Sequence, residues 1–106
     1  MSWVIECPEK LSKVGKQAAA IMNQFMKKYN LQTGGCQTLY HPEDWKDRGE
    51  SYGTESELVI VYDGGDLFDI MDGYLYNLQD ELIREFDAIG LYFEPCTHWY
   101  CAVYKH

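Results

Sequence analysis

One run of residues constrains the fold more than any other part of the chain. Residues 57–63, ELVIVYD, are mostly apolar and β-branched at successive positions, so both faces of a strand formed there would be apolar. A strand of that kind is stable where other elements cover both of its faces. The run therefore predicts a central strand, and the rest of the chain must supply its neighbours and its cover.

Two longer segments carry apolar residues at helical spacing. Over residues 8–29 the apolar positions recur at steps of three and four, with the proline in the first turn and Asn30 just past the end. A second pattern runs over residues 66–89 and stops at Gly90, where a left-handed glycine is preferred. Gly73 lies inside this second pattern and costs about 1 kcal/mol relative to alanine. We therefore expect two amphipathic helices, the second with a break allowed at Gly73.

Shorter segments supply the remaining strands. Residues 36–40, CQTLY, predict a short strand, and residues 41–49, HPEDWKDRG, predict a brief helix with proline in its first turn. Residues 91–105 alternate around a turn-like centre at residues 95–97 and predict a β-hairpin. Residues 3–5 are expected to add an edge strand.

The order of these elements favours one fold class. It predicts an α+β fold of two layers, in which a mainly antiparallel sheet of three to five strands is packed by two amphipathic helices. With 106 residues, of which 46% are hydrophobic, the chain is expected to form a single domain spanning residues 1–106. This composition lies far from that of disordered chains.

The compartment is expected to be the cytoplasm. No apolar run approaches the roughly 18 to 20 residues that span a bilayer, and the start MSWVIECPEKL lacks the pattern of a signal peptide. The 4 cysteines form no CxxC pair, so we expect them to be reduced and mostly to be small core residues. They are Cys7, Cys36, Cys96 and Cys101.

The formal net charge is −8 and is unevenly distributed along the chain. Residues 1–30 hold five lysines and two glutamates, a net charge of +3. Residues 31–106 hold four basic and fifteen acidic residues, a net charge of −11. An acidic chain is a poor ligand for nucleic acid, whose binding depends on phosphate neutralisation by clustered Lys and Arg. We therefore expect no direct binding to nucleic acid.

The segment DGGDLFDIMDG, residues 63–73, places four aspartates three positions apart. This segment is not a calcium loop of the EF-hand type. In an EF-hand the oxygen ligands occupy alternate positions and the last ligand is a glutamate, whereas here the aspartates are three positions apart and Tyr74 stands at the last position. A looser divalent-cation site built from Asp63, Asp66 and Asp69 remains open. Asp66 as a helix N-cap, with Asp69 three residues later, explains half of the motif without any ligand.

The acidic pattern continues through residues 80–87, with only Arg84 to offset it. Residues 63–87 hold eight acids and one base, a net charge of −7. Such a surface either keeps the protein soluble or attracts a partner with a basic surface. Aromatic residues beside acidic segments favour the partner, since Tyr and Trp are enriched in interfaces. The predicted partner-binding residues are Asp63, Asp66, Asp69, Asp72, Asp80, Glu81, Glu85, Asp87, Trp45 and Tyr52.

Metal and nucleophile chemistry are weaker alternatives. CTHWYC, residues 96–101, offers two cysteines and His98 to zinc, but structural zinc sites usually combine two closely spaced ligand pairs. A cysteine nucleophile is conceivable for Cys36 with His41 or for Cys101 with His98. Neither pair lies in a known catalytic motif, and we expect no cofactor and no catalytic residue.

In size and charge the chain resembles the small inhibitors that phages and mobile elements direct against host defence nucleases, such as anti-CRISPR and antirestriction proteins. It resembles immunity proteins that neutralise nuclease toxins in the same respects. The resemblance implies a non-enzymatic acidic inhibitor or adaptor that binds a basic nucleic-acid-handling protein or nuclease complex, with carboxylates in the place of phosphates. A small cysteine- or metal-dependent enzyme, a ligand-binding domain and a subunit of a larger assembly are the alternatives.

Overall fold

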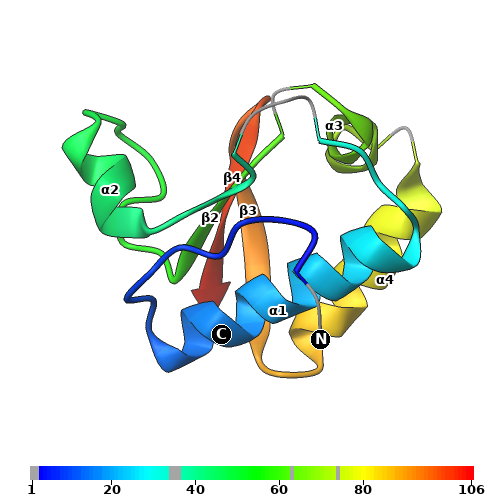
Figure 1. Cartoon of the computed structure of the whole chain (residues 1–106), viewed down its shortest axis with the longest axis horizontal. Coiled ribbons are helices and arrows are strands. Elements are labelled where there is room, and N and C mark those ends of the chain that lie inside the picture. Colours follow the sequence, from blue (N-terminus) through cyan, green and yellow to red (C-terminus); the bar gives the residue numbers. More distant parts are fainter. Residues whose placement is uncertain (1–2, 34–36, 63, 74) are drawn as a thin grey trace.

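The computed structural model describes residues 3–33, 37–62, 64–73 and 75–106 (Figure 1). Its four strands form one antiparallel sheet in the order β1-β2-β4-β3, which confirms the predicted α+β class and a sheet of three to five strands. In chain order the elements are α1 (Lys13–Lys28), β1 (Leu39–Tyr40), α2 (Pro42–Asp47), β2 (Leu58–Val61), α3 (Asp66–Met71), α4 (Tyr76–Asp87), β3 (Leu91–Thr97) and β4 (Tyr100–Lys105).

Strand β2 is the predicted central strand. All four of its residues are buried, and it pairs with β1 on one side and β4 on the other. Leu58 and Ile60 belong to the main core together with apolar residues of α1, α3 and α4. Val59 and Val61 face a second, smaller core with Trp45 of α2. Helices therefore cover both faces of the sheet, although α2 covers only part of its face (Figure 1).

Helix α1 is shorter at its start than its apolar pattern predicts. It begins at Lys13 because the hydroxyl of Ser12 caps it, accepting a hydrogen bond from the Gly15 N–H at 2.9 Å. Placing the proline of residue 8 in the first turn was therefore wrong. At the other end Asn30 has φ of 50°, and the Leu31 N–H donates to the Met26 carbonyl at 2.9 Å. This Schellman-type ending confirms Asn30 as the stop.

The second helical pattern forms two helices. Gly73 has φ of 87°, a conformation that ends α3 before α4 begins, so the allowed break at Gly73 is confirmed. Behind the break, the side-chain amide of Gln79 donates to the carbonyls of Ile70 and Met71, both at 3.1 Å. These bonds satisfy carbonyl groups at the end of α3 and hold the two helices together.

Asp66 is not the N-cap that the sequence suggested. Gly65 occupies that position, and Asp66 is the first residue of α3. The Asp66 carboxylate instead accepts a hydrogen bond from the Gln32 N–H at 2.8 Å, and the Asp66 N–H donates to the Gln32 carbonyl at 3.0 Å. The N-cap prediction failed because the Asp66 carboxylate binds the backbone of a segment that lies far away in the chain.

The C-terminal hairpin turns later than predicted. Its turn is at His98 and Trp99, and Pro95 lies inside β3. A proline is tolerated there because β3 is an edge strand and the pairing with β4 shifts register between Pro95 and Thr97. Trp99 is a turn residue and packs against the second core.

The N-terminal segment is not the expected edge strand. Residues 3–5 form no strand, and the Val4 N–H donates instead to the Asn23 side-chain oxygen of α1 at 2.7 Å. Ile5 is buried in the main core. No helix in the described part of the chain has the length and apolar character that crossing a membrane requires.

Candidate functional site

The predicted acidic residues do not behave as one set. Asp63 lies outside the described residues. Asp69 of α3 and Asp72 just after it are exposed, and their carboxylates make no hydrogen bond or ion pair with any described residue. These two are therefore open to a partner.

Glu81 has a structural role that its sequence position does not reveal. Its carboxylate accepts a hydrogen bond from the Tyr29 hydroxyl at 2.5 Å and lies 3.3 Å from Nζ of Lys28. The hydrogen bond from Tyr29 lowers the pKa of Glu81, and the nearby Lys28 lowers it further. Glu81 thus joins α4 to the end of α1, and it is less available to a partner than Asp69 or Asp72.

Two further carboxylates of α4 have local partners. Asp80 lies 3.0 Å from the Arg84 guanidinium, and Asp87 lies 3.2 Å from the His106 ring. Both aspartates stay well exposed, at 62% and 70% of the side chain. Surface pairs of this kind contribute little to stability and can exchange their partners.

Glu85 is half-buried rather than a surface residue. Its Oε2 atom is buried and has no hydrogen-bond partner among the described residues. Burial raises the pKa of Glu85, and the nearby charge of Glu81 raises it further. This carboxylate faces the protein interior and is a poor candidate for binding a partner.

Glu85→Gln is expected to stabilise the protein near neutral pH by up to about 1 kcal/mol, because the neutral amide avoids burying a charge. An acid whose pKa is raised by folding favours the protonated folded state, so stability falls as pH rises from its unfolded to its folded pKa. The advantage of the variant should therefore shrink as the pH falls toward 4. Urea unfolding of both proteins at several pH values measures this, and an equal gain at all pH values would contradict it.

Trp45 was predicted to contact a partner, and this was wrong because the side chain is fully buried, with 0% exposed. Its ring lies 4.9 Å from those of Tyr40 and Tyr100, and the Arg48 guanidinium lies 4.4 Å from it. The short helix α2 turns its only tryptophan toward β2. Trp45 is a core residue of the fold.

Tyr52 is exposed, at 62%, but it lies in the loop after α2, away from the predicted acids of α3 and α4. Figure 1 shows α2 and the loop after it at one end of the molecule, and α3 and α4 at the other. The acidic segments 43–57 and 63–87 therefore do not form one continuous surface. Tyr52 is accordingly separate from the surface of α3 and α4.

Sequence reasoning missed an exposed stripe on α4. Tyr76, Asp80, Ile83 and Asp87 follow one another at steps of four, three and four, so they share one side of the helix. We call these four residues the α4 stripe. Tyr76 is 68% exposed and Ile83 is 44% exposed, so two large side chains with apolar surface stand between carboxylates on this side of the helix. The spacing was visible in the sequence, but the break of the helix and the buried side of α4 were needed to interpret it.

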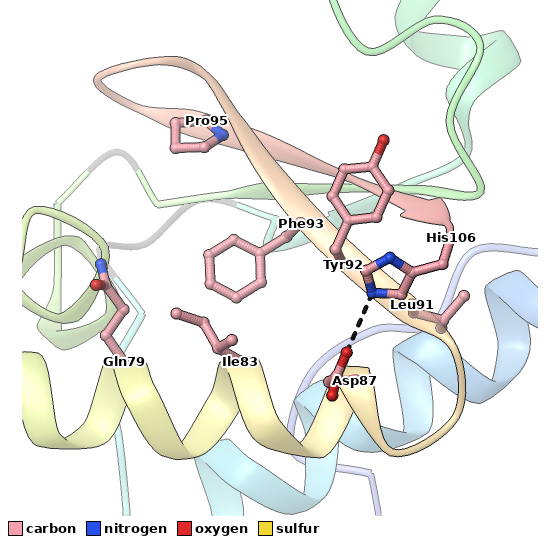
Figure 2. A pocket seen from close by; sticks show the side chains of 8 residues that line it. All are labelled: Gln79, Ile83, Asp87, Leu91, Tyr92, Phe93, Pro95 and His106. Carbon is pink, nitrogen blue, oxygen red and sulfur yellow. Dashed lines mark ion pairs between the residues drawn. The ribbon is translucent and has the colours of Figure 1, made fainter.

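Beside the stripe a groove of about 320 Å³ separates α4 from β3. Ile83 of α4 and Phe93 of β3 both project into it, and the pair of Asp87 with His106 lies at one end (Figure 2). We call it the α4–β3 groove. It is lined by Gln79, Ile83, Asp87, Leu91, Tyr92, Phe93, Pro95 and His106.

The residues suggested for nucleophilic chemistry are not arranged for it where the structure describes them. Both ring nitrogens of His41 are engaged, with the Glu43 N–H at 3.1 Å and the Lys10 carbonyl at 3.2 Å. Its proposed partner Cys36 lies outside the described residues. Cys101 is fully buried, and burial raises the pKa of its thiol, which disfavours the reactive thiolate.

The metal-site suggestions find little support in the described residues. No group of three or more His, Cys, Asp or Glu side chains within residues 3–33, 37–62, 64–73 and 75–106 is placed to hold a metal ion. Cys96, His98 and Cys101 of the zinc suggestion therefore form no such group. The divalent-cation suggestion at Asp63, Asp66 and Asp69 stays a prediction, because it includes Asp63.

Comparison of the chain with protein-family models, with curated proteins and with solved structures finds no match. Its function is therefore inferred from the surface of α3 and α4. That surface combines open carboxylates, exposed apolar side chains and a groove, which together suit the binding of another protein.

Proposed function

We propose that this chain is a non-enzymatic binding protein, an acidic inhibitor or adaptor, that docks onto a basic nucleic-acid-handling protein through α3 and α4. The observation that supports this best is the α4 stripe, where exposed apolar and carboxylate side chains alternate on one side of a helix. Asp69 in α3 and Asp72 just after it add two open carboxylates.

The combination of side chains favours a protein partner. Tyr76 and Ile83 supply apolar area of the kind that forms the centre of an interface. The carboxylates around them raise the rate of encounter with a basic surface and disfavour acidic partners. Solubility alone would require the charges but not the exposed apolar residues between them.

The proposed partner is a nuclease or a DNA-binding protein in the cytoplasm. The basic groove of such a protein accepts phosphates at regular spacing, and carboxylates along α3 and α4 would occupy those positions as a nucleic-acid mimic. The formal net charge of −7 over residues 63–87 favours a partner of that kind. An immunity protein against a nuclease toxin would use the same surface, and the identity of the partner separates the two.

The test is an affinity capture from the lysate of the native host, with bound proteins identified by mass spectrometry. The wild-type chain is expected to capture a nuclease or a DNA-binding protein, and high salt or added DNA should release it. A variant with Asp69, Asp72 and Asp80 changed to Lys should lose the capture. Its melting temperature should change by only a few degrees, because these side chains are exposed.

A matched control carries the same change of charge at the other end of the molecule. Asp44, Asp47 and Glu55 are also exposed, and changing all three to Lys should leave the capture intact. Equal capture by the wild type and by the variant in α3 and α4 would contradict the proposed function. Equal loss in both variants would show that only the overall charge matters, which also contradicts it.

A further inference from the structure

We infer that the α4–β3 groove binds an extended basic segment of the partner, which pairs as an added strand with the free edge of β3. This inference rests on the proposed function and specifies how the partner is held. It combines three features of the groove, namely an unpaired strand edge, an apolar floor and exposed carboxylates.

The first feature is the free edge of β3. This strand is last in the sheet order, and no strand of the described residues pairs with its outer side. The His106 N–H donates to the Gly90 carbonyl at 2.9 Å, so these two residues form the hydrogen-bonded pair next to the pair of Leu91 and Lys105. In an antiparallel ladder this pattern turns the backbone groups of Leu91 and Phe93 away from β4, toward the free edge.

The free edge is also short. Pro95 has no N–H to donate, and the register shift between Pro95 and Thr97 bends the strand beyond it. Only residues 91–94 therefore offer regular pairing. Such an edge resists pairing with long strands of other proteins, yet it can still pair with a short extended segment.

The second feature is the apolar floor. Ile83 and Phe93 face one another across the groove, as Figure 2 shows, and the groove volume is about 320 Å³. In an added strand every second side chain points to the same face of the sheet as Phe93. One of these side chains would enter the groove and contact Ile83, which is 44% exposed without it.

The third feature is the charge around the groove. The carboxylates of Asp80 and Asp87 are 62% and 70% exposed, and Glu94 is exposed on β3. The described bases that pair with Asp87 and Asp80 are His106 and Arg84, respectively. A Lys or Arg of the occupant can replace His106 at Asp87. Residues between the apolar ones would point to the same face of the sheet as Glu94, so the complementary segment alternates basic and apolar residues.

The test uses a synthetic peptide, acetyl-KVKVKVK-amide, and the full chain labelled with nitrogen-15. Without the peptide, the amides of Leu91 and Phe93 should exchange with solvent faster than those of Tyr92 and Glu94, which face β4. Saturating peptide should slow exchange at Leu91 and Phe93 about tenfold or more. A second version of the peptide is N-methylated at alternate residues, which removes the backbone N–H donors along the edge of the peptide that would pair with β3. This peptide should bind the protein at least tenfold more weakly.

Two variants of matched exposure test the floor of the groove. Ile83→Arg should weaken binding of the peptide at least tenfold, because it fills the groove with a cation. Ile89→Arg is the control, since Ile89 is 45% exposed and does not line the groove. Both can be measured by fluorescence polarisation of a labelled peptide.

Three results would overturn the inference: unchanged exchange at Leu91 and Phe93, equal binding of the N-methylated peptide, or equal binding by the two isoleucine variants. A partner that enters the groove as a helix, or a small apolar ligand there, would produce the second result. The proposed function is tested separately by lysate capture with the Asp69, Asp72 and Asp80 variant. Loss of capture in that variant, with equal peptide binding by Ile83→Arg and Ile89→Arg, would reject the groove inference alone.

Discussion

Trp45→Ala is expected to destabilise the protein by about 3 to 5 kcal/mol, a large share of the stability of a small domain. The side chain is 0% exposed and forms the centre of the second core with Val59, Val61 and Tyr100. The main core lies on the other face of the sheet, so its residues cannot fill the resulting cavity. The variant also loses the Arg48 contact with the indole ring, 4.4 Å from its centre.

Urea unfolding followed by far-UV circular dichroism measures this loss. Tyr52→Ala is the control, because Tyr52 is an aromatic residue 62% exposed, and its removal should change the stability by less than about 0.5 kcal/mol. A loss below about 1 kcal/mol for Trp45→Ala would mean that α2 does not pack on the sheet as described. It would also reopen Trp45 as a binding residue.

Gly15→Ala is expected to destabilise the protein by about 1 to 3 kcal/mol, although alanine usually favours a helix by about 1 kcal/mol. Gly15 is buried in α1, and a Cβ atom built on it would lie 2.6 Å from the carbonyl oxygen of Glu57. That oxygen belongs to the backbone just before β2, so it cannot move aside as a flexible side chain would. The close approach of α1 to the sheet therefore depends on this glycine.

The comparison is with Gln17→Ala, an exposed position in the same helix, where the effect should stay within about 0.5 kcal/mol. Both variants can be unfolded thermally and in urea. A gain in stability for Gly15→Ala would show that α1 can shift away from Glu57 without cost. The higher helical propensity of alanine would then determine the stability of the variant.

Features that depend on near neighbours in the chain were predictable. The steps of three and four gave both helical patterns, Asn30 ended α1, and Gly73 separated α3 from α4, because capping and left-handed turns are local. The apolar run at β2 predicted a covered central strand for a similar reason. Its composition is compatible with few other environments.

Features that depend on distant residues were not predictable. Asp66 looked like an N-cap, but its carboxylate is bound by the backbone of Gln32. Trp45 looked like a surface residue among acids, but α2 packs it against β2. Pro95 looked like a turn, and only the edge position of β3 shows why it lies within a strand.

The candidate site shows the same division. The charge of residues 63–87 was evident from the sequence, but not which carboxylates are open. Lys28 belongs to the basic segment of residues 1–30, and Glu81 belongs to the acidic segment of residues 31–106. They form an ion pair because α1 packs beside α4 (Figure 1). Glu85 is turned inward, whereas Asp69 and Asp72 stay free.

The sequence by itself determined the fold class, the helical segments, the central strand and the excess of negative charge, since each depends on composition or on residues within a few positions. The tertiary structure decided which acids are exposed, that Tyr76 and Ile83 stand among them, and that α4 and the edge of β3 enclose a groove. Those properties arise from packing between segments far apart in the chain. Burial and pairing are set by such contacts rather than by residue type.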